Sequence, residues 1–320
     1  MGFIKITFNI IGTFNAKCNK YLPNKNKAVL FLKEAYYATR HGCSPDDFFR
    51  YEFYKKSNFE RKKFITYRRS QRIMRQYNDK NAVHIFQDKI EFNKFFKDFI
   101  KRNYLDLSVA TQEEFSQFVE KHSSVIMKPT RGGQGKGIFK IKSDEIANYS
   151  VDDYRNYICE ELLIQHPKMS TINPSSVNTI RVLTFKGDVI ACALRSGGGG
   201  DIVDNLHSSG VCAHLDIGSG IIDAPCIDNT LKKHLYHPYT KIILPGFQVP
   251  NWDLLLEKAR EAAKLIPSVQ YVGWDMVILE DDIAIIEGNN DPGHDVVQMI
   301  VQEGLYEKIK ALEKNSFLHE

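Results

Sequence analysis

Apolar side chains recur at the spacing of amphipathic helices along the first quarter of the chain. The repeat is clear in two segments, at Leu30, Ala35 and Tyr36 and then at Phe48, Phe49, Tyr51 and Phe53. Between them, Ser44-Pro45-Asp46-Asp47 has the composition of a helix start. The pattern predicts a mainly helical N-terminal region over residues 1–85.

Two further helices are predicted before the texture of the chain changes. Residues 89–102 place four phenylalanines on one face, at Phe92, Phe95, Phe96 and Phe99, and we interpret them as core. Thr111, followed by Glu113 and Glu114, resembles an N-cap with an acidic first turn. It opens a helix that is expected to end near residue 122.

Strands dominate from residue 124 onward. Residues 124–129 and 138–141 flank a glycine-rich loop, which predicts a hairpin with a long tip. The other predicted strands are 157–164, 179–185, 189–195, 271–279 and 283–287, with a helix over 252–265 that Pro267 ends. The chain is therefore expected to be α+β, with domains at 1–85, 86–165 and 166–320.

Composition excludes several classes of protein. No apolar run approaches the roughly 20 residues that span a bilayer, so no transmembrane helix is predicted. The first 20 residues do not have the pattern of a signal peptide, because polar residues and a glycine interrupt their apolar stretches at Lys5, Asn9, Gly12 and Asn15. The six cysteines are scattered singly, without a CxxC pair, so no zinc or redox motif is predicted. We expect buried thiols in a cytoplasmic protein.

Charge is distributed unevenly although the net charge is only +4. Residues 1–80 carry 18 Lys and Arg against 6 Asp and Glu, a net +12, whereas the remainder carries 25 against 33, a net −8. The N-terminal surplus fits either a solvated helical face or a patch for an anionic partner such as a glycan or a lipid surface. Basic clusters at 61–63 and 68–69 alternate with Phe64 and Tyr67, but no nucleic-acid-binding motif accompanies them.

The glycine-rich loop is the first candidate for chemistry. Gly132, Gly133, Gly135 and Gly137 free the backbone to approach phosphate oxygens, and Lys128 and Lys136 add positive charge. The spacing does not match GxxxxGK[ST], and a strand rather than a helix follows the loop, which disfavours a P-loop. A flexible hairpin tip is the alternative for this loop taken alone.

Three oxygen-bearing side chains on the last hairpin form a candidate magnesium site. Asp275 lies on one arm, and Glu287 and Asn289 lie two residues apart on the other, on one face of the strand. Carboxylates within such apolar runs are seldom left without a partner.

Two arginines and a second glycine-rich segment complete the candidate set. Arg181 lies on an alternating strand, and Arg195 leads into four consecutive glycines and then the polar segment 204–210. An arginine fork matches phosphate or carboxylate oxygens in pairs. For His207, a structural role is at least as probable as a catalytic one.

Taken in order, these residues resemble the ATP-grasp superfamily and, more closely, the sugar-transfer-associated ATP-grasp family of capsule and surface-polysaccharide synthesis. The motifs that carry the resemblance are Gln165-His166-Pro167, Asn178-Thr179-Ile180-Arg181, 204–210, His237-Pro238, Gly273-Trp274-Asp275 and Glu287-Gly288-Asn289. They cover roughly residues 88–299. The resemblance implies a fold in which two α+β subdomains clasp ATP, and it leaves residues 1–80 unexplained.

Roles follow from the resemblance by position. It implies that Lys89 and Lys128 contact the ATP phosphates and that the glycine-rich loop, residues 132–137, forms a flap over them. Glu160, Glu161 and Leu163 would line the adenine pocket. Asp275, Glu287 and Asn289 would bind magnesium, with two ions expected. The resemblance also makes Arg181, Arg195 and Lys136 catalytic and places Asn205, His207 and Ser209 by the acceptor.

Two positions depart from the superfamily pattern. The acidic residue that often holds the ribose falls at Pro167, which leaves Gln165 as the candidate. An arginine often found two residues before the metal aspartate is replaced by Gly273.

The resemblance implies an ATP- and magnesium-dependent ligase that joins a carboxylate to an amine through an acyl-phosphate. Its context indicates a uronic-acid sugar and an amino acid as substrates, and the N-terminal charge favours a lipid-linked or membrane-surface substrate at the inner membrane. A sugar kinase and a non-catalytic nucleotide- or glycan-binding protein remain as alternatives.

Overall fold

The computed structural model describes residues 2–133, 135–199 and 210–316. Five helices form the N-terminal region: α1 (Gly2–Tyr21), α2 (Lys27–His41), α3 (Pro45–Arg50), α4 (Asn58–Arg61) and α5 (Tyr67–Tyr77). Ser44 begins α3 with a capping box to Asp47, as its sequence predicts. The helix α1 was not predicted, and Phe14 and Cys18 are the residues through which it joins the core.

A four-stranded antiparallel sheet forms the small subdomain. Its order is β1 (Tyr104–Asp106), β4 (Tyr157–Glu161), β2 (Ser124–Pro129) and β3 (Phe139–Lys142). The helix α8 (Gln112–His122) packs on it and begins with the predicted Thr111–Glu114 capping box. Two 3₁₀ helices, η2 (Ser143–Asn148) and η3 (Val151–Tyr154), close its core.

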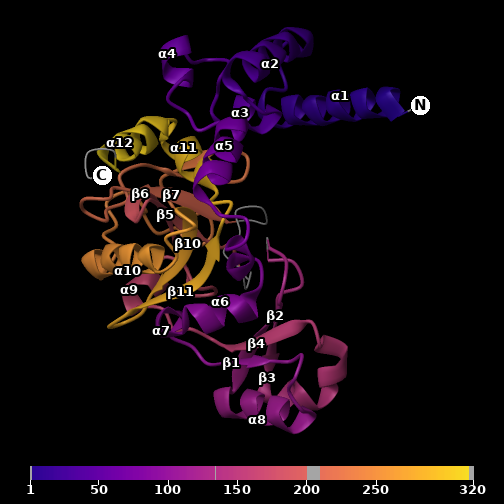
Figure 1. Cartoon of the computed structure of the whole chain (residues 1–320), viewed down its shortest axis with the longest axis vertical. Coiled ribbons are helices and arrows are strands. Elements are labelled where there is room, and N and C mark those ends of the chain that lie inside the picture. The colour runs from indigo at the N-terminus through magenta and orange to yellow at the C-terminus, as the bar shows by residue number, and fades with distance from the viewer. Residues whose placement is uncertain (1, 134, 200–209, 317–320) are drawn as a thin grey trace.

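A seven-stranded sheet forms the centre of the molecule. Its order is β11 (Ile283–Asn289), β10 (Tyr271–Ile278), β5 (Thr179–Phe185), β6 (Asp188–Ser196), β7 (Val211–Leu215), β8 (Cys226–Ile227) and β9 (Lys233–His234). Every pairing in it is antiparallel. Figure 1 shows this sheet between the N-terminal helices at one end and the small subdomain at the other.

Helices cover both faces of the large sheet, so its central strands are apolar on both sides. On one face, Ile180 and Val182 pack with α10 (Trp252–Leu265), α6 (Lys89–Phe95) and α7 (Lys97–Ile100). On the other face, Leu183 and Phe185 pack with the N-terminal helices, α11 (His294–Val301) and α12 (Tyr306–Ser316). The remaining short elements are η1 (Val83–Phe86) and α9 (Pro167–Ser170).

The predicted boundaries change where long-range packing decides them. The helix expected over 89–102 breaks at Phe96, whose ring packs 5.3 Å from that of Trp274. Residues 89–100 thereby contribute to the core of the large sheet, although the sequence groups them with the small subdomain. The strand predicted over 157–164 ends at Glu161.

Part of the N-terminal positive charge is used inside the fold. Arg61 is buried, donates to the Phe53 carbonyl at 2.9 Å and lies 3.9 Å from the centre of the Tyr37 ring. Arg69 donates to the carbonyls of Lys62 and Phe64 at 2.6 and 2.7 Å. Arg61 therefore does not belong to an exposed anion-binding patch, which corrects the charge-based expectation for this residue.

All six cysteines are buried free thiols, as predicted. In the part of the chain that the structure describes, no helix combines the length and the apolar character that crossing a bilayer requires.

One buried amide helps to fix the N-terminal region to the large subdomain. Gln298 on α11 is fully buried; its Nε2 donates to the Ile65 carbonyl at 3.0 Å, and its Oε1 accepts from the amides of Ile65 and Leu305 at 2.8 and 3.0 Å. One side chain thus satisfies three buried backbone groups in two parts of the chain.

We expect Gln298→Leu to destabilise the protein by about 2–5 kcal/mol, because it leaves these backbone groups buried and unpaired. Urea denaturation measures the loss. Gln117→Leu on the exposed face of α8 is the control and should change stability by less than about 0.5 kcal/mol. Equal stability of Gln298→Leu and the wild type would contradict the stabilising role of the Gln298 hydrogen bonds.

Candidate active site

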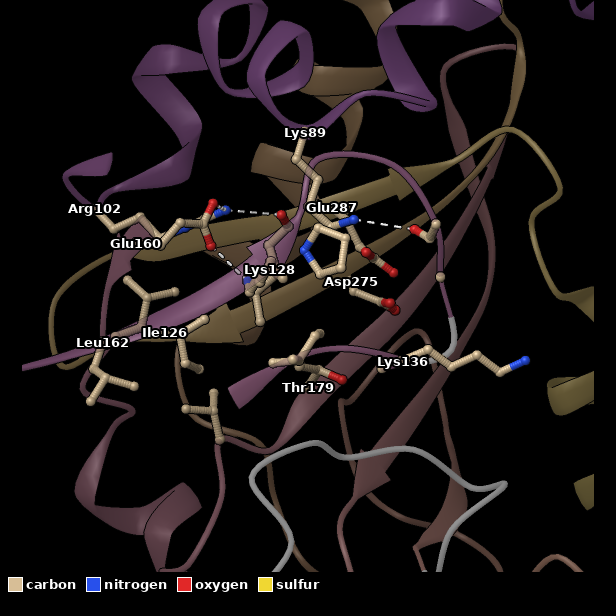
Figure 2. Close-up of a pocket in the computed structure, with 18 of the residues that line it drawn as sticks. Lys89, Arg102, Ile126, Lys128, Lys136, Glu160, Leu162, Thr179, Asp275 and Glu287 are labelled. Carbon is tan, nitrogen blue, oxygen red and sulfur yellow. Dashed lines mark hydrogen bonds and ion pairs between the residues drawn. The ribbon is translucent and has the colours of Figure 1, made fainter. Parts of the chain in front are cut away.

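A cavity of about 140 Å³ lies where the small sheet faces the ends of β10 and β11. Figure 2 shows Lys89, Lys128, Glu160, Asp275 and Glu287 directed toward it from five different elements. Twelve residues singled out from the sequence line it: Lys89, Lys128, Gly132, Gly133, Gly135, Lys136, Glu160, Glu161, Leu163, Arg195, Asp275 and Glu287. The geometry therefore brings together segments up to about 200 residues apart.

The remaining candidates lie elsewhere. Arg181 and Asn289 line an adjoining cavity of about 400 Å³ that shares Lys89, Arg195 and Glu287 with the first. Asn205, His207 and Ser209 lie outside the described residues. Lys136 is exposed, and Figure 2 shows its side chain pointing away from the Lys89–Glu287 group.

Glu160 on β4 is the buried anion of the small-sheet wall. Arg102 and Lys128 donate to its two oxygens at 2.9 and 2.6 Å, and Asn93 donates at 2.8 Å. Burial alone raises the pKa of Glu160, but the two cations outweigh it and hold that pKa well below its usual range. The carboxylate thus fixes Lys128 in the cavity, which Glu160 also lines.

Arg102 extends this cluster across the molecule. Its guanidinium also donates to the carbonyls of Ile285 and Ile286 on β11 at 2.8 and 3.0 Å. Through Glu160 and Arg102, the small sheet is bonded to the strand that carries Glu287. Neither Arg102 nor Asn93 belongs to a motif in the sequence, so no sequence signal could have identified them.

The glycine-rich loop is anchored at its base. Lys89 donates from Nζ to the Gly132 carbonyl at 3.1 Å, and Arg131 pairs with Asp88 at 3.2 Å. Gly132 and Gly137 adopt φ angles of +112° and +73°, which side chains rarely allow. Burial lowers the pKa of Lys89, and the Glu287 carboxylate opposes this shift.

Apolar side chains form the remaining wall of the cavity. Ile126, Ile138, Leu162 and Val177 line it beside Leu163 and Ile286. The Glu161 carboxylate is turned to Asn103, whose backbone and side-chain amides donate to it at 3.0 and 2.8 Å. This apolar cleft between charged groups suits a flat aromatic base linked to phosphates.

Asp275 and Glu287 face each other across the last hairpin, next to a register shift in the ladder. Arg181 donates to both Asp275 oxygens at 2.7 and 3.0 Å, and Arg195 donates at 2.9 Å. Burial works to raise the pKa of Asp275, but these arginines keep it low; burial and the neighbouring Asp275 raise the pKa of Glu287. Asp275 is therefore held as an anion by arginines, whereas for Glu287 burial and the Asp275 charge outweigh the opposing effects of Arg181, Asn289 and Lys128.

These residues fit a magnesium ion. A carboxylate offers about four acceptor positions, and the arginines occupy three on Asp275. Asn289 donates to Glu287 at 3.3 Å, which keeps its amide beside the pair. The described residues contain no group of three or more His, Cys, Asp and Glu that could hold a metal, and magnesium usually needs only one or two carboxylates completed by phosphates and water.

Arg181 makes several contacts within the protein besides lining the adjoining cavity. It is buried, and besides Asp275 it donates to the Pro292 carbonyl at 2.9 Å. Its donors are thus used to position Asp275 and the loop after β11. A Cβ on Gly273 would meet that Pro292 carbonyl oxygen at 2.3 Å, so the departure from the superfamily pattern has a steric reason.

Three of the family-like motifs meet in a buried polar network. The Gln165 oxygen accepts from the backbone and side-chain amides of Asn178 at 2.8 and 2.9 Å; the Asn178 oxygen accepts from Ser196 at 2.6 Å, and Ser196 lies 3.1 Å from His237. The Gln165 amide donates to two backbone carbonyls. The prediction that Gln165 holds the ribose is therefore wrong, because its side chain is fully engaged in this network.

A comparison with protein-family models identifies the family of the chain. Residues 147–314, more than half of the chain, match the model of the sugar-transfer-associated ATP-grasp family. The chain belongs to this family. Residues 106–183 also match the YheC/D-like ATP-grasp model, so the ATP-grasp fold is established from the family match.

Solved structures similar to this ATP-grasp chain are distant. The ATP-grasp ligase PsnB in complex with a minimal precursor is 13% identical, with a TM-score of 0.48 over 75% of this chain, which spans 63% of PsnB. D-alanine–D-alanine ligase from Bacillus anthracis complexed with ATP is 11% identical, with a TM-score of 0.40 over 72% of this chain and 69% of that one. The comparison with curated proteins returned no match.

We expect Glu160→Gln to lower the stability of this ATP-grasp protein by about 3–5 kcal/mol at pH 7, because two buried cations lose their counterion. Glu160 has a depressed folded pKa, so its contribution is present above the pKa of an unfolded glutamate, about 4.3, and is lost as the pH falls below it. The difference between the urea midpoints of wild type and variant should therefore begin to shrink as the pH falls below about 4.3 and continue to shrink toward the depressed folded pKa.

Glu257→Gln on the exposed face of α10 is the matched control and should change neither the midpoint nor its pH dependence. A stability difference for Glu160→Gln that does not depend on pH would show that the buried ion pair does not have the assigned role.

Proposed function

We propose that this chain is an ATP- and magnesium-dependent carboxylate–amine ligase. The observation that carries the proposal is one cavity lined by Lys89, Lys128, the glycine-rich flap and the Asp275–Glu287 pair, with a second cavity adjoining it. The first has the polarity expected for a nucleotide with its phosphates and metal, and the second leaves room for the other substrates.

In the proposed reaction, an oxygen of the substrate carboxylate attacks the γ-phosphorus of ATP, ADP leaves and an acyl-phosphate forms. The amine then attacks the acyl carbon, inorganic phosphate leaves and the nitrogen loses a proton, which gives the amide. Asp275, Glu287 and Asn289 would hold magnesium, with two ions proposed, and its positive charge would neutralise phosphate oxygens.

The side chains and the flap of the protein would bind the phosphates, position Asp275 and exclude water. Lys128, oriented by Glu160, and Lys89 lie where they can bind phosphate oxygens, and such fixed charges need no reorganisation during the reaction. Arg195, which lines both cavities, is the arginine placed to meet the transferring phosphoryl group, while Arg181 positions Asp275. The flap excludes water, which would otherwise hydrolyse the acyl-phosphate.

The proposed substrates are a uronic-acid sugar and an amino acid, used in the synthesis of a capsular or surface polysaccharide in the cytoplasm. The family's association with sugar transfer supports the sugar. The net +12 of residues 1–80 supports a lipid-linked or membrane-surface form of it, although the buried Arg61 does not contribute to that surface.

The test is phosphate release from ATP and magnesium, with uronic acids and amino acids offered singly and in pairs. We expect release only with a matched pair, together with an amide product identified by mass spectrometry. Glu287→Gln should reduce the rate at least about a hundredfold, because the site loses a charged metal ligand. A fluorescent ATP analogue checks that the variant still binds nucleotide.

Glu280→Gln, in the exposed turn of the same hairpin, is the control and should retain full activity. A stable phosphoester formed with a sugar alone would instead establish a kinase. Nucleotide binding without turnover by any pair, lipid-linked sugars included, would favour a binding protein.

A further inference from the structure

The larger cavity has a wall that the ATP-grasp fold does not account for. It shares Lys89, Gly132, Gly133, Arg195, Ile286 and Glu287 with the nucleotide cavity. Its other side includes Lys20 and Tyr21 at the end of α1 and Arg50 at the end of α3. The helical N-terminal region, outside the family match, therefore encloses the space next to the site of chemistry.

A chain of ion pairs fixes this wall to the large subdomain. Lys17 on α1 pairs with Asp46 at 2.6 Å, Asp46 lies 3.6 Å from Arg50, and Arg50 pairs with Asp295 on α11. Asp295 follows the loop that leaves β11, the strand that carries Glu287 and Asn289. Because these pairs are partly shielded from water, they hold the wall better than exposed ion pairs do.

Aromatic packing adds to the same contact. The Tyr21 ring stacks on Phe49 with 5.6 Å between centroids, and Phe49 in turn packs 5.4 Å from Phe14. The last turn of α1 therefore has a defined position beside the cavity. Lys20 lies on this turn.

Lys20 differs from the other cations of the wall. Lys17 and Arg50 each have a carboxylate partner, whereas Lys20 is exposed, its ammonium lies 5.2 Å from the centre of the Tyr21 ring, and among the described residues no carboxylate pairs with it. It lines the larger cavity and not the nucleotide cavity. An anion that contacts Lys20 thus lies outside the phosphate site.

Acidic residues in the same cavity do not cancel this charge. Asp295 is paired with Arg50, and Asp228 accepts hydrogen bonds from Thr230 and from the His234 ring. Asp291 also lines the cavity and is suited to an ammonium group. The wall therefore offers a cation and an anion to a substrate that carries both kinds of group, as an amino acid does.

We propose that the end of α1 completes the acceptor site, with Lys20 as a specificity-determining residue for an anionic group that remains unreacted during ligation. This inference rests on the proposed ligase function. The anion is a carboxylate on the amino acid or a phosphate on the sugar. Both have the same requirement, a cation at the wall away from the nucleotide.

Calorimetric titration in the presence of a non-hydrolysable ATP analogue and magnesium tests the inference. One arm compares amino acids with their amides, which lack the carboxylate; the other compares glucuronic acid 1-phosphate with glucuronic acid. We expect Lys20→Met to weaken binding of the probe that carries the tested carboxylate or phosphate at least about tenfold in one arm, and to leave binding of the counterpart without that group unaffected. Lys20→Arg should retain the affinity.

Lys25→Met, an exposed lysine of the following loop that lines neither cavity, is the matched control and should bind as the wild type does. Amine labelling followed by mass spectrometry gives a second measurement, because a bound anionic probe should protect Lys20 and not Lys25. Lys20 is exposed, so its variants are expected to fold, and their thermal midpoints verify this.

The inference is overturned if Lys20→Met leaves both arms unchanged, if it weakens the probes with and without the tested anionic group equally, or if the wild type binds no probe that carries this group more tightly than its counterpart. Phosphate release, measured in parallel, separates this result from the proposed function. Lys20-dependent binding without any turnover would contradict the ligase alone, whereas turnover with an unchanged acceptor KM in Lys20→Met would contradict only the role of Lys20.

Discussion

The buried carboxylate of Glu160 is the interaction on which the geometry of the molecule depends. A lone charge in this position would be unstable, so two cations and an amide converge on it. One cation, Lys128, belongs to the small sheet, and the other, Arg102, is bonded to β11 of the large sheet. The same charge therefore holds Lys128 in place and joins the two sheets between which the first cavity lies.

Asp275 repeats this arrangement on the opposite wall. Two arginines from neighbouring strands of the large sheet satisfy it, and one of them continues to the Pro292 carbonyl in the loop after β11. In both clusters an acidic side chain is held by basic groups from other segments before any ligand is present. The cavity between them is preorganised, which is the condition under which fixed charges contribute most to catalysis.

The fold could be predicted where the pattern is local. The alternation of β5 and β6, the Thr111 capping box and the helix ended by Pro267 all depend on neighbouring residues, and they were found from the sequence. The helix α1 was missed because its buried residues face helices and a sheet that follow it in the chain. The break at Phe96 depends on Trp274, which is 178 positions away, and local spacing carries no information about such a contact.

The candidate site divides in the same way. Twelve of the residues that line the first cavity were named from the sequence because motifs mark them, but several of the side chains that hold them in place were not. Arg102 stands alone in the sequence, and Arg181 and Gln165 have the appearance of ligand-binding residues although their polar atoms are used within the protein. Composition and spacing indicate which side chains are available for chemistry, while the hydrogen-bond partners supplied by the fold decide which of them are engaged.

The glycine-rich flap contributes Gly132 and Gly133 to both cavities. A single backbone segment therefore borders both cavities, and a displacement of that segment changes the shape of both. A movement of the flap that closes one cavity therefore closes the other at the same time. A chain built in this way cannot shield an activated intermediate without also confining the molecule that is to consume it.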